Sequence, residues 1–260
     1  MIHKARSPIP PEISTYVLVF DHRLSSAEDW KNFRKDITSR FDRPETHRHL
    51  PDGGTKRGLP LLQYGEINGY AAVIGLQRGC ELLEEIQIAG LLPPHLQFLK
   101  EVPVLQKHTL HVAHTPQTYA VKRMILPLKP TEWTQPMLHK ERIALLEQKL
   151  TSALVSYAGE FAYDIAQYLL YANLYTFEVY QEKNAYKANR NYKEAAAHEA
   201  GKREKRNVKP SWICLDATFE TNLILPPTFT LGKEKGSGYG WGKAAESQHV
   251  HQILLAKHLY

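Results

Sequence analysis

Two histidines in a polar loop are the residues of this chain best suited to acid–base chemistry. The loop, residues 42–58, contains His47 and His49 together with Lys56, and Tyr64 follows in the next apolar segment. Histidine can both accept and donate a proton near neutral pH, so such a pair beside basic groups suits general acid and base catalysis. A His-x-His pair in a loop also occurs without any catalytic role, and the sequence leaves this alternative open.

The same residue types suit cleavage of RNA, and this chemistry needs neither a metal ion nor another cofactor. The ribose 2′-hydroxyl attacks the adjacent phosphorus once a base removes its proton, and an acid protonates the leaving 5′-oxygen. A cationic side chain stabilises the charge on the phosphorane. We assign this last role to Lys56 on chemical grounds alone.

A second unusual stretch, LGKEKGSGYGWGK, occupies residues 231–243. Glycines leave backbone N–H groups bare and lysines supply positive charge, so this glycine stretch is typical of a phosphate-binding loop. Tyrosine and tryptophan between the later glycines add rings on which bases can stack. The residues that we expect to contact RNA are Lys233, Lys235, Gly236, Ser237, Gly238, Tyr239, Gly240, Gly242 and Lys243.

The glycine stretch does not fit the common nucleotide-binding motifs. A P-loop ending at Lys243 would have Ser237 at its first glycine and Ala244 at its magnesium-binding hydroxyl. The dinucleotide-binding pattern fails as well, because its third glycine is missing in either register. Interleaved lysine, glycine and aromatic residues therefore favour a flexible polyanion, with a solvated hairpin or linker as the alternative.

Composition indicates a globular protein with an anionic partner. The 260 residues carry a formal net charge of +6 and a pI near 9.1, which points toward an anionic partner, although proteins that bind no anion also carry such an excess. The two cysteines form no metal-binding pair, and no apolar run approaches the length of a membrane span. The opening residues lack the apolar segment of a signal peptide, so we expect a cytoplasmic protein without a membrane partner.

The first part of the chain alternates between strand-like and helical patterns. Strand patterns cover residues 14–21, 59–64, 70–76 and 107–113, and helical patterns cover residues 27–41 and 80–89. The order β-α-β-β-α-β is that of a ferredoxin-like domain, which we place at residues 1–112.

The remaining residues, 113–260, are assigned to a second domain of the same α+β class. Residues 138–180 show a long helical periodicity. The basic residues 182–209 predict an exposed helix or a solvated insertion. Residues 212–225 predict two strands, or one bent strand, that lead into the glycine stretch, and residues 244–260 are compatible with a short helix.

Four segments, in this order, resemble the repeat-processing endoribonucleases of CRISPR systems, the Cas-six family, and are most similar to its subtype b. They are THRHL (46–50), LPLLQYGEINGYAAVIGLQRG (59–79), LEQKLTSALVSYAGEFAYDI (146–165) and FETNLILPPTFTLGKEKGSGYG (219–240). The last is similar to the family's Phe-x-x-Asn and Gly-Leu-Gly-Lys terminal motif. Together the four segments span most of the chain.

This resemblance implies two tandem ferredoxin-like, or RRM-like, domains, with the Gly-rich loop of the second domain packed against bound RNA. It also implies metal-independent endonuclease cleavage within CRISPR repeat RNA, which leaves a 5′-hydroxyl and a 2′,3′-cyclic phosphate. By position, His49 is the first choice for general acid or base, and His47 is its partner. Tyr64 matches the motif tyrosine and can orient the 2′-hydroxyl, although a strand tyrosine equally suits a core.

The partners and the exact activity are left open by the residues. Transfer of the product to a CRISPR effector complex and formation of a homodimer both fit the resemblance. Gly65 stands where the family usually has lysine, and Arg48 replaces an asparagine between the histidines. Two alternatives to a cleaving enzyme follow: a repeat-RNA-binding subunit without efficient cleavage, and an RRM-like RNA-binding adaptor outside CRISPR systems.

Overall fold

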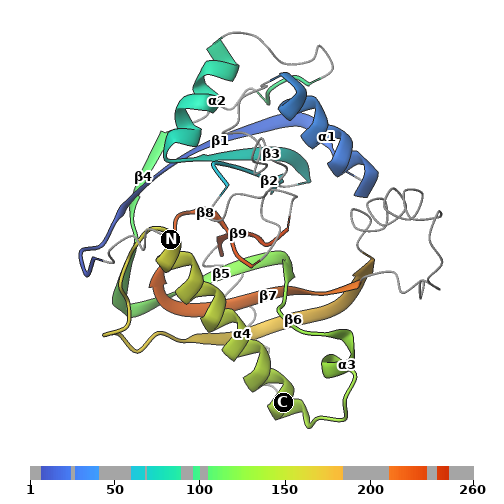
Figure 1. Ribbon diagram of the computed structural model, residues 1–260, viewed down its shortest axis with the longest axis vertical. Helices are drawn as coiled ribbons and strands as arrows, with labels where there is room; N and C mark the ends of the chain where they lie inside the picture. Colours follow the sequence, from blue (N-terminus) through green and yellow to red (C-terminus); the bar gives the residue numbers. More distant parts are fainter. Residues whose placement is uncertain are drawn as a thin grey trace, which may run out of the picture.

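Two antiparallel sheets, one from each part of the chain, form the framework of the protein, whose computed structural model is shown in Figure 1. The structure describes residues 7–24, 27–40, 60–67, 69–88, 96–99, 105–183, 211–232 and 239–245. Within these residues, no helix is long and apolar enough to cross a membrane.

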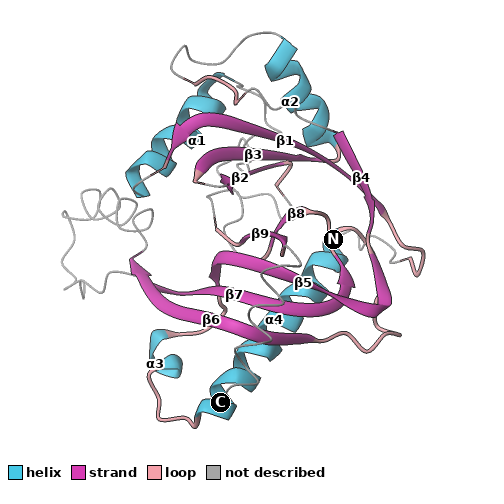
Figure 2. Ribbon diagram, turned by 180° about the vertical axis from the view of Figure 1, so that it is seen from behind, coloured by secondary structure: helices cyan, strands magenta, loops and turns pink. Residues whose placement is uncertain are grey.

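The first sheet has the strand order β2-β3-β1-β4, and its neighbouring strands are antiparallel. Its elements follow along the chain as β1 (Glu12–Arg23), α1 (Ala27–Arg40), β2 (Leu62–Ile67), β3 (Tyr70–Leu76), α2 (Arg78–Ile88) and β4 (Leu105–Thr109). The predicted β-α-β-β-α-β order is therefore confirmed, and the strand order is that of a ferredoxin-like domain. Helices α1 and α2 lie on the side of this sheet that is turned away from the second sheet (Figure 2).

The second sheet repeats this arrangement and adds one edge strand. Its elements are β5 (His111–Ile125), α3 (Pro130–Trp133), α4 (His139–Glu160), β6 (Ala172–Lys183), β7 (Ser211–Ile224), β8 (Thr228–Thr230) and β9 (Trp241–Ala244). The strand order is β6-β7-β5-β9-β8, so that its first four strands correspond to β2-β3-β1-β4 of the first sheet. The two tandem ferredoxin-like domains are thus confirmed. The chain passes from the first sheet to the second at Leu110, and the domain boundary after residue 112 stays a prediction.

The predicted helix over residues 138–180 is wrong beyond Glu160. Helix α4 ends there, and Ala162 has a positive φ of 58°, which no helix residue adopts. Residues 172–183 instead form β6, which pairs with β7 along its length. Exposed Thr176 and Glu178 alternate with less exposed aromatic and β-branched side chains, a period of two that suits a strand. The region 212–225 forms the single strand β7 rather than two strands.

The first sheet packs in two directions because β1 and β3 are covered on both faces. Leu18 and Val73 belong to a cluster with Phe33 of α1, on the helix-covered face. Ile74 points to the opposite face and belongs to a second cluster that includes Leu154 of α4. The second cluster therefore joins the inner face of the first sheet to the core of the second domain.

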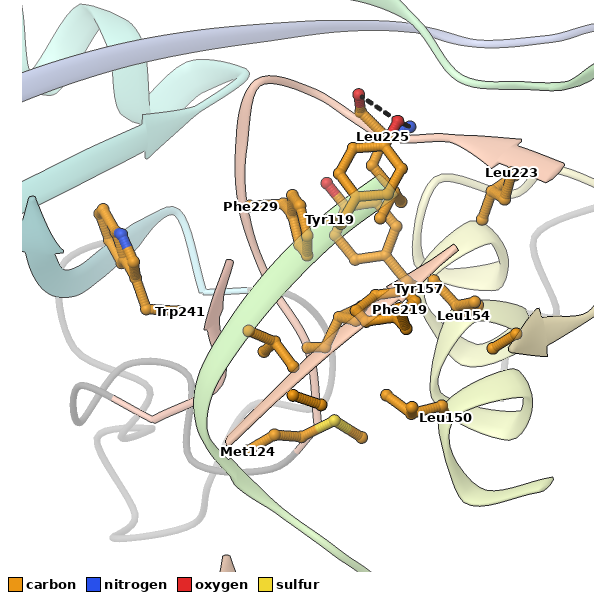
Figure 3. Packing of buried hydrophobic residues seen from close by; sticks show 14 of the residues in the cluster. Tyr119, Met124, Leu150, Leu154, Tyr157, Phe219, Leu223, Leu225, Phe229 and Trp241 are labelled. Atoms are coloured by element: carbon orange, nitrogen blue, oxygen red, sulfur yellow. Dashed lines mark hydrogen bonds between the residues drawn. The ribbon is translucent and has the colours of Figure 1, made fainter. Parts of the chain in front are cut away.

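Aromatic rings fill the core of the second domain between its sheet and α4 (Figure 3). The ring centroids of Tyr119 and Phe229 lie 5.5 Å apart, and those of Tyr119 and Phe219 lie 6.2 Å apart. Leu150 and Leu154 of α4 are fully buried against this group. The helix thus holds the sheet by its apolar stripe, and its own exposed face takes no part in the core.

Replacing Leu150 with alanine is expected to lower the free energy of unfolding by about 2–5 kcal/mol, because it leaves a cavity in a fully buried position. The matched control is Val155→Ala, on the same helix but 42% exposed, for which we expect a loss of under about 1 kcal/mol. Urea denaturation followed by circular dichroism measures both values. Equal losses for the two variants would contradict the packing described here.

Candidate nucleic-acid interface

The two ends of the glycine stretch lie in the β8–β9 hairpin of the second domain. The strands pair antiparallel, and the Leu231 N–H donates to the Gly240 carbonyl at 2.7 Å, which closes the base of the loop between them. The Gly240 N–H donates to the Arg123 carbonyl of β5 at 3.1 Å. These bonds fix the base of the loop to the sheet. The predicted RNA contacts Lys233, Lys235, Gly236, Ser237 and Gly238 lie outside the described residues.

Close packing requires glycine at positions 240 and 242. The sequence predicted instead that these two residues expose their backbone to a phosphate. Both are buried. Gly240 has a φ of 70°, and a Cβ there would lie 1.7 Å from the Leu231 carbonyl oxygen. A Cβ at Gly242 would lie 2.2 Å from the ring of Phe229. These two glycines therefore shape the hairpin, and their predicted contact with RNA stays a prediction.

Tyr239, predicted to contact RNA, is also buried, with 9% of its surface exposed. The guanidinium of Arg123 lies 4.6 Å from its ring centroid, and Trp212 meets the same ring edge to face at 5.1 Å. Its hydroxyl donates to Glu182 Oε1 at 2.9 Å. Burial raises the pKa of Tyr239, and the nearby Glu182 carboxylate raises it further. These contacts make Tyr239 an anchor of the β8–β9 hairpin, and its predicted contact with RNA stays a prediction.

Two lysines on one face of the second sheet are accessible to a polyanion. Lys243 of β9 is exposed and lies opposite Ala120, and the exposed Lys122 of β5 lies opposite Trp241. Directly opposed residues of an antiparallel pair point to the same face, so both lysines share the face that carries Trp241. Lys243 was predicted from the sequence. Lys122 was missed, because only the strand pairing brings it beside the hairpin.

The same face meets the first domain through a close contact between Trp241 and Gly65. Trp241 is 7% exposed, and a Cβ on Gly65 would lie 1.6 Å from a carbon of its indole ring. Next to it, the hydroxyl of buried Thr230 donates to Oε1 of buried Gln63 on β2. In Figure 3 the indole lies apart from the Tyr119 group, on the side of the blue-green strands of the first domain.

This contact, which we name the Gly65–Trp241 contact, explains the departure from lysine at position 65. No side chain fits at this position while the indole occupies it. A lysine would have to displace Trp241, and with it the start of β9. Position 65 therefore fits the hairpin of the second domain, and it supplies no cation for catalysis.

The structure places Tyr64 in the core of the first domain. It is 2% exposed, its ring meets Phe33 edge to face at 6.2 Å, and Arg34 lies 6.0 Å from its ring centroid. Burial raises its pKa, and its hydroxyl has no hydrogen-bond partner among the residues described. Of the two roles that the sequence allowed, these contacts are those of a core residue, and orientation of the 2′-hydroxyl by Tyr64 stays a prediction.

The other three candidates for catalysis, His47, His49 and Lys56, lie outside the described residues. Their loop joins α1 to β2 along the chain, so it enters the strand that carries Gln63 and Gly65. The strand that follows the histidine loop, β2, is thus the strand on which the β8–β9 hairpin rests; we call this hairpin, with the glycine stretch that it carries, the glycine hairpin.

Comparison with known proteins agrees with this architecture. Residues 11–92 match the family described as the Cas6b N-terminal domain. A crystal structure of Cas6b has a TM-score of 0.69 at 13% identity, covering 90% of this chain and 100% of that chain. A crystal structure of the CRISPR RNA processing endoribonuclease Cas6b has a TM-score of 0.59 at 14% identity, with the same coverage.

A third solved structure, Csf5, a type IV Cas6 crRNA endonuclease, has a TM-score of 0.51 at 13% identity, covering 91% of this chain and 100% of that chain. No curated protein matches the chain in sequence. At these identities the solved structures show the fold. Together with the family match over residues 11–92, they confirm the Cas6b-like resemblance drawn from the sequence motifs.

A double-mutant cycle tests the Gly65–Trp241 contact. Gly65→Ala is expected to lower the free energy of unfolding by about 2 kcal/mol, because its methyl group overlaps the indole. In a Trp241→Leu background, the same substitution should cost under about 0.5 kcal/mol, because the overlapping ring is gone. Denaturant titration of the four proteins gives both values. An equal cost of Gly65→Ala in both backgrounds would show that the ring does not rest on Gly65.

Proposed function

We propose that this Cas6b-like chain is an endoribonuclease that cleaves CRISPR precursor RNA within its repeats. The family match over residues 11–92 and the Cas6b-like fold over 90% of the chain support this proposal. The observation that carries it furthest is the Gly65–Trp241 contact. Through this contact, the hairpin that bears the glycine stretch rests on β2, the strand that follows the histidine loop along the chain.

The chemistry we propose is attack by the ribose 2′-hydroxyl, without a metal ion. A general base takes the 2′-hydroxyl proton as the 2′-oxygen bonds to phosphorus, and the bond from phosphorus to the 5′-oxygen breaks as a general acid protonates that oxygen. We assign His49 to one of these proton transfers, with His47 as its partner and Lys56 as the cation that stabilises the phosphorane. The products are a 2′,3′-cyclic phosphate and a 5′-hydroxyl.

We further propose that Lys122 and Lys243 bind the phosphates of the repeat RNA. Both are exposed and lie on the face of the second sheet that carries Trp241, so a strand of RNA along this face passes beside the glycine hairpin. Lysine is a compact cation that binds phosphate without fixing a base, which suits binding of a backbone. Passage of the product to an effector complex and formation of a homodimer stay predictions.

One observation favours the second candidate, a repeat-RNA-binding subunit without efficient cleavage. The space at Gly65 is filled by Trp241, and Tyr64 is buried in the core, so neither residue is exposed on β2. The acid and base that we propose then come from the histidine loop, residues 42–58. Cleavage assays on variants of that loop therefore separate the two candidates.

Cleavage of the cognate repeat RNA in EDTA tests the proposed reaction. We expect wild type to cut, and His49→Ala to cut at least about 100-fold more slowly in single turnover, because proton transfer is lost. A substrate with 2′-deoxyribose at the scissile nucleotide should not be cut at all, since its nucleophile is absent.

The matched control is His114→Ala, which removes an exposed histidine of β5 and should leave the rate unchanged. Filter binding measures RNA affinity alongside the rates, and His49→Ala should keep it within about threefold. Tight binding by wild type with no cutting would instead support the binding-subunit candidate.

Salt titration of binding tests the two lysines. Lys122→Ala and Lys243→Ala should each weaken repeat-RNA binding and lower the slope of log affinity against log salt by about 0.7 to 1, because one phosphate contact is lost. The control is Lys140→Ala, which removes an exposed lysine of α4 from another part of the molecule. Slopes equal to wild type for both sheet variants would place the RNA elsewhere.

A further inference from the structure

Arg123 has a backbone conformation that is rare for residues other than glycine. Its φ is 53°, and it lies in a register shift of the β5–β7 pairing between Val121 and Met124. Two residues, Lys122 and Arg123, thus stand where β7 offers only Asp216 between its paired positions, which defines a β-bulge. Such a conformation costs free energy and persists only where surrounding contacts require it.

Contacts to the backbone of Arg123 hold this bulge. Its N–H donates to Asp216 Oδ1 at 2.7 Å, and the same carboxylate oxygen accepts the hydroxyl of Tyr180 at 3.0 Å. The Arg123 carbonyl accepts the N–H of Gly240 at 3.1 Å. Pairing of β5 with β9 extends to Lys122, so the bulge stands at the point where the chain of the hairpin leaves the sheet.

The bulge directs the side chain of Arg123 onto the second stem of the glycine hairpin, by which we mean residues 239–245. Its Nη2 donates to Glu182 Oε1 at 2.7 Å, and its guanidinium lies 4.6 Å from the ring centroid of Tyr239. The Tyr239 hydroxyl donates to the same oxygen of Glu182 at 2.9 Å. Burial by itself lowers the pKa of Arg123, but the hydrogen bond and charge of Glu182 outweigh it and raise that pKa.

We propose that Arg123 is a positioning residue for RNA binding, which holds Tyr239 and thereby the second stem of the glycine hairpin against the sheet. This inference rests on the proposed function. Arginine is required because one planar group covers the ring and reaches the carboxylate at the same time. The charge of Arg123 is balanced by the ion pair with Glu182, so that Arg123 acts through Tyr239 and Gly240 and does not itself bind the RNA backbone.

Arg123→Met tests this proposal by two measurements. Hydrogen exchange followed by mass spectrometry should show faster exchange in a peptide covering residues 239–245, because the stem loses its lateral contact. Binding of the cognate repeat RNA should weaken about tenfold. The salt slope of binding should stay equal to that of wild type, because no phosphate contact is lost.

The matched control is Arg23→Met in the first domain. Arg23 makes the same kind of contact, with its guanidinium 4.6 Å from the ring centroid of Tyr70 and its Nη2 donating to the Tyr70 hydroxyl at 3.2 Å. This variant loses an equal charge and should leave exchange of residues 239–245 unchanged. Arg123→Lys is a more conservative substitution, which keeps the charge but removes the planar group. If the planar group is what holds the stem, this variant should change both measurements as Arg123→Met does.

Two results would overturn the proposal. Unchanged exchange of residues 239–245 in Arg123→Met would show that Arg123 does not hold the stem. A salt slope lowered by about one would show that Arg123 binds a phosphate directly. Failure of wild type to bind repeat RNA would contradict the proposed function instead, and the exchange rates would still decide whether Arg123 holds the hairpin.

Discussion

The arrangement of this molecule depends on the space left by the absent side chain of Gly65. Trp241 fills that space so closely that a single added carbon would lie 1.6 Å from its ring. Burial of a tryptophan contributes a large apolar area and, in a close-packed interior, fixes the position of whatever carries it. Here it fixes the start of β9, and the hydrogen bond between Thr230 and Gln63 fixes β8 beside it. The two domains thus meet at the hairpin that carries the glycine stretch.

Around this contact the structure separates two tasks that the sequence places in one motif. The described residues of the glycine stretch, apart from Lys243, serve the fold: Gly240 and Gly242 allow close packing, and Tyr239 anchors one stem. The surface that we propose for RNA phosphates is formed by the exposed Lys122 and Lys243, on the neighbouring strands β5 and β9. Proteins commonly carry their binding and catalytic groups on loops and exposed faces that a rigid scaffold holds in place.

Local patterns predicted the element order of the first domain, because β1 to β3 are short apolar runs and the two helices have apolar residues at helical spacing. They failed at β6, whose aromatic residues continue the spacing of α4 and whose pairing with β7 depends on residues far along the chain. The same limit applies to the site. Nothing near Gly65 in the sequence indicates that Trp241 occupies its space, and nothing near Arg123 indicates Tyr239 or Glu182. Such contacts arise from tertiary structure alone.

The measurement that tests the central claim most directly is the chemical identity of the ends produced from the cognate repeat RNA, determined by mass spectrometry. The proposed attack by the 2′-hydroxyl predicts a 2′,3′-cyclic phosphate on the upstream product and a 5′-hydroxyl on the downstream product. An upstream 3′-hydroxyl with a downstream 5′-phosphate would mean that water is the nucleophile. That result would contradict the account, because no role would then remain for the 2′-hydroxyl in the reaction.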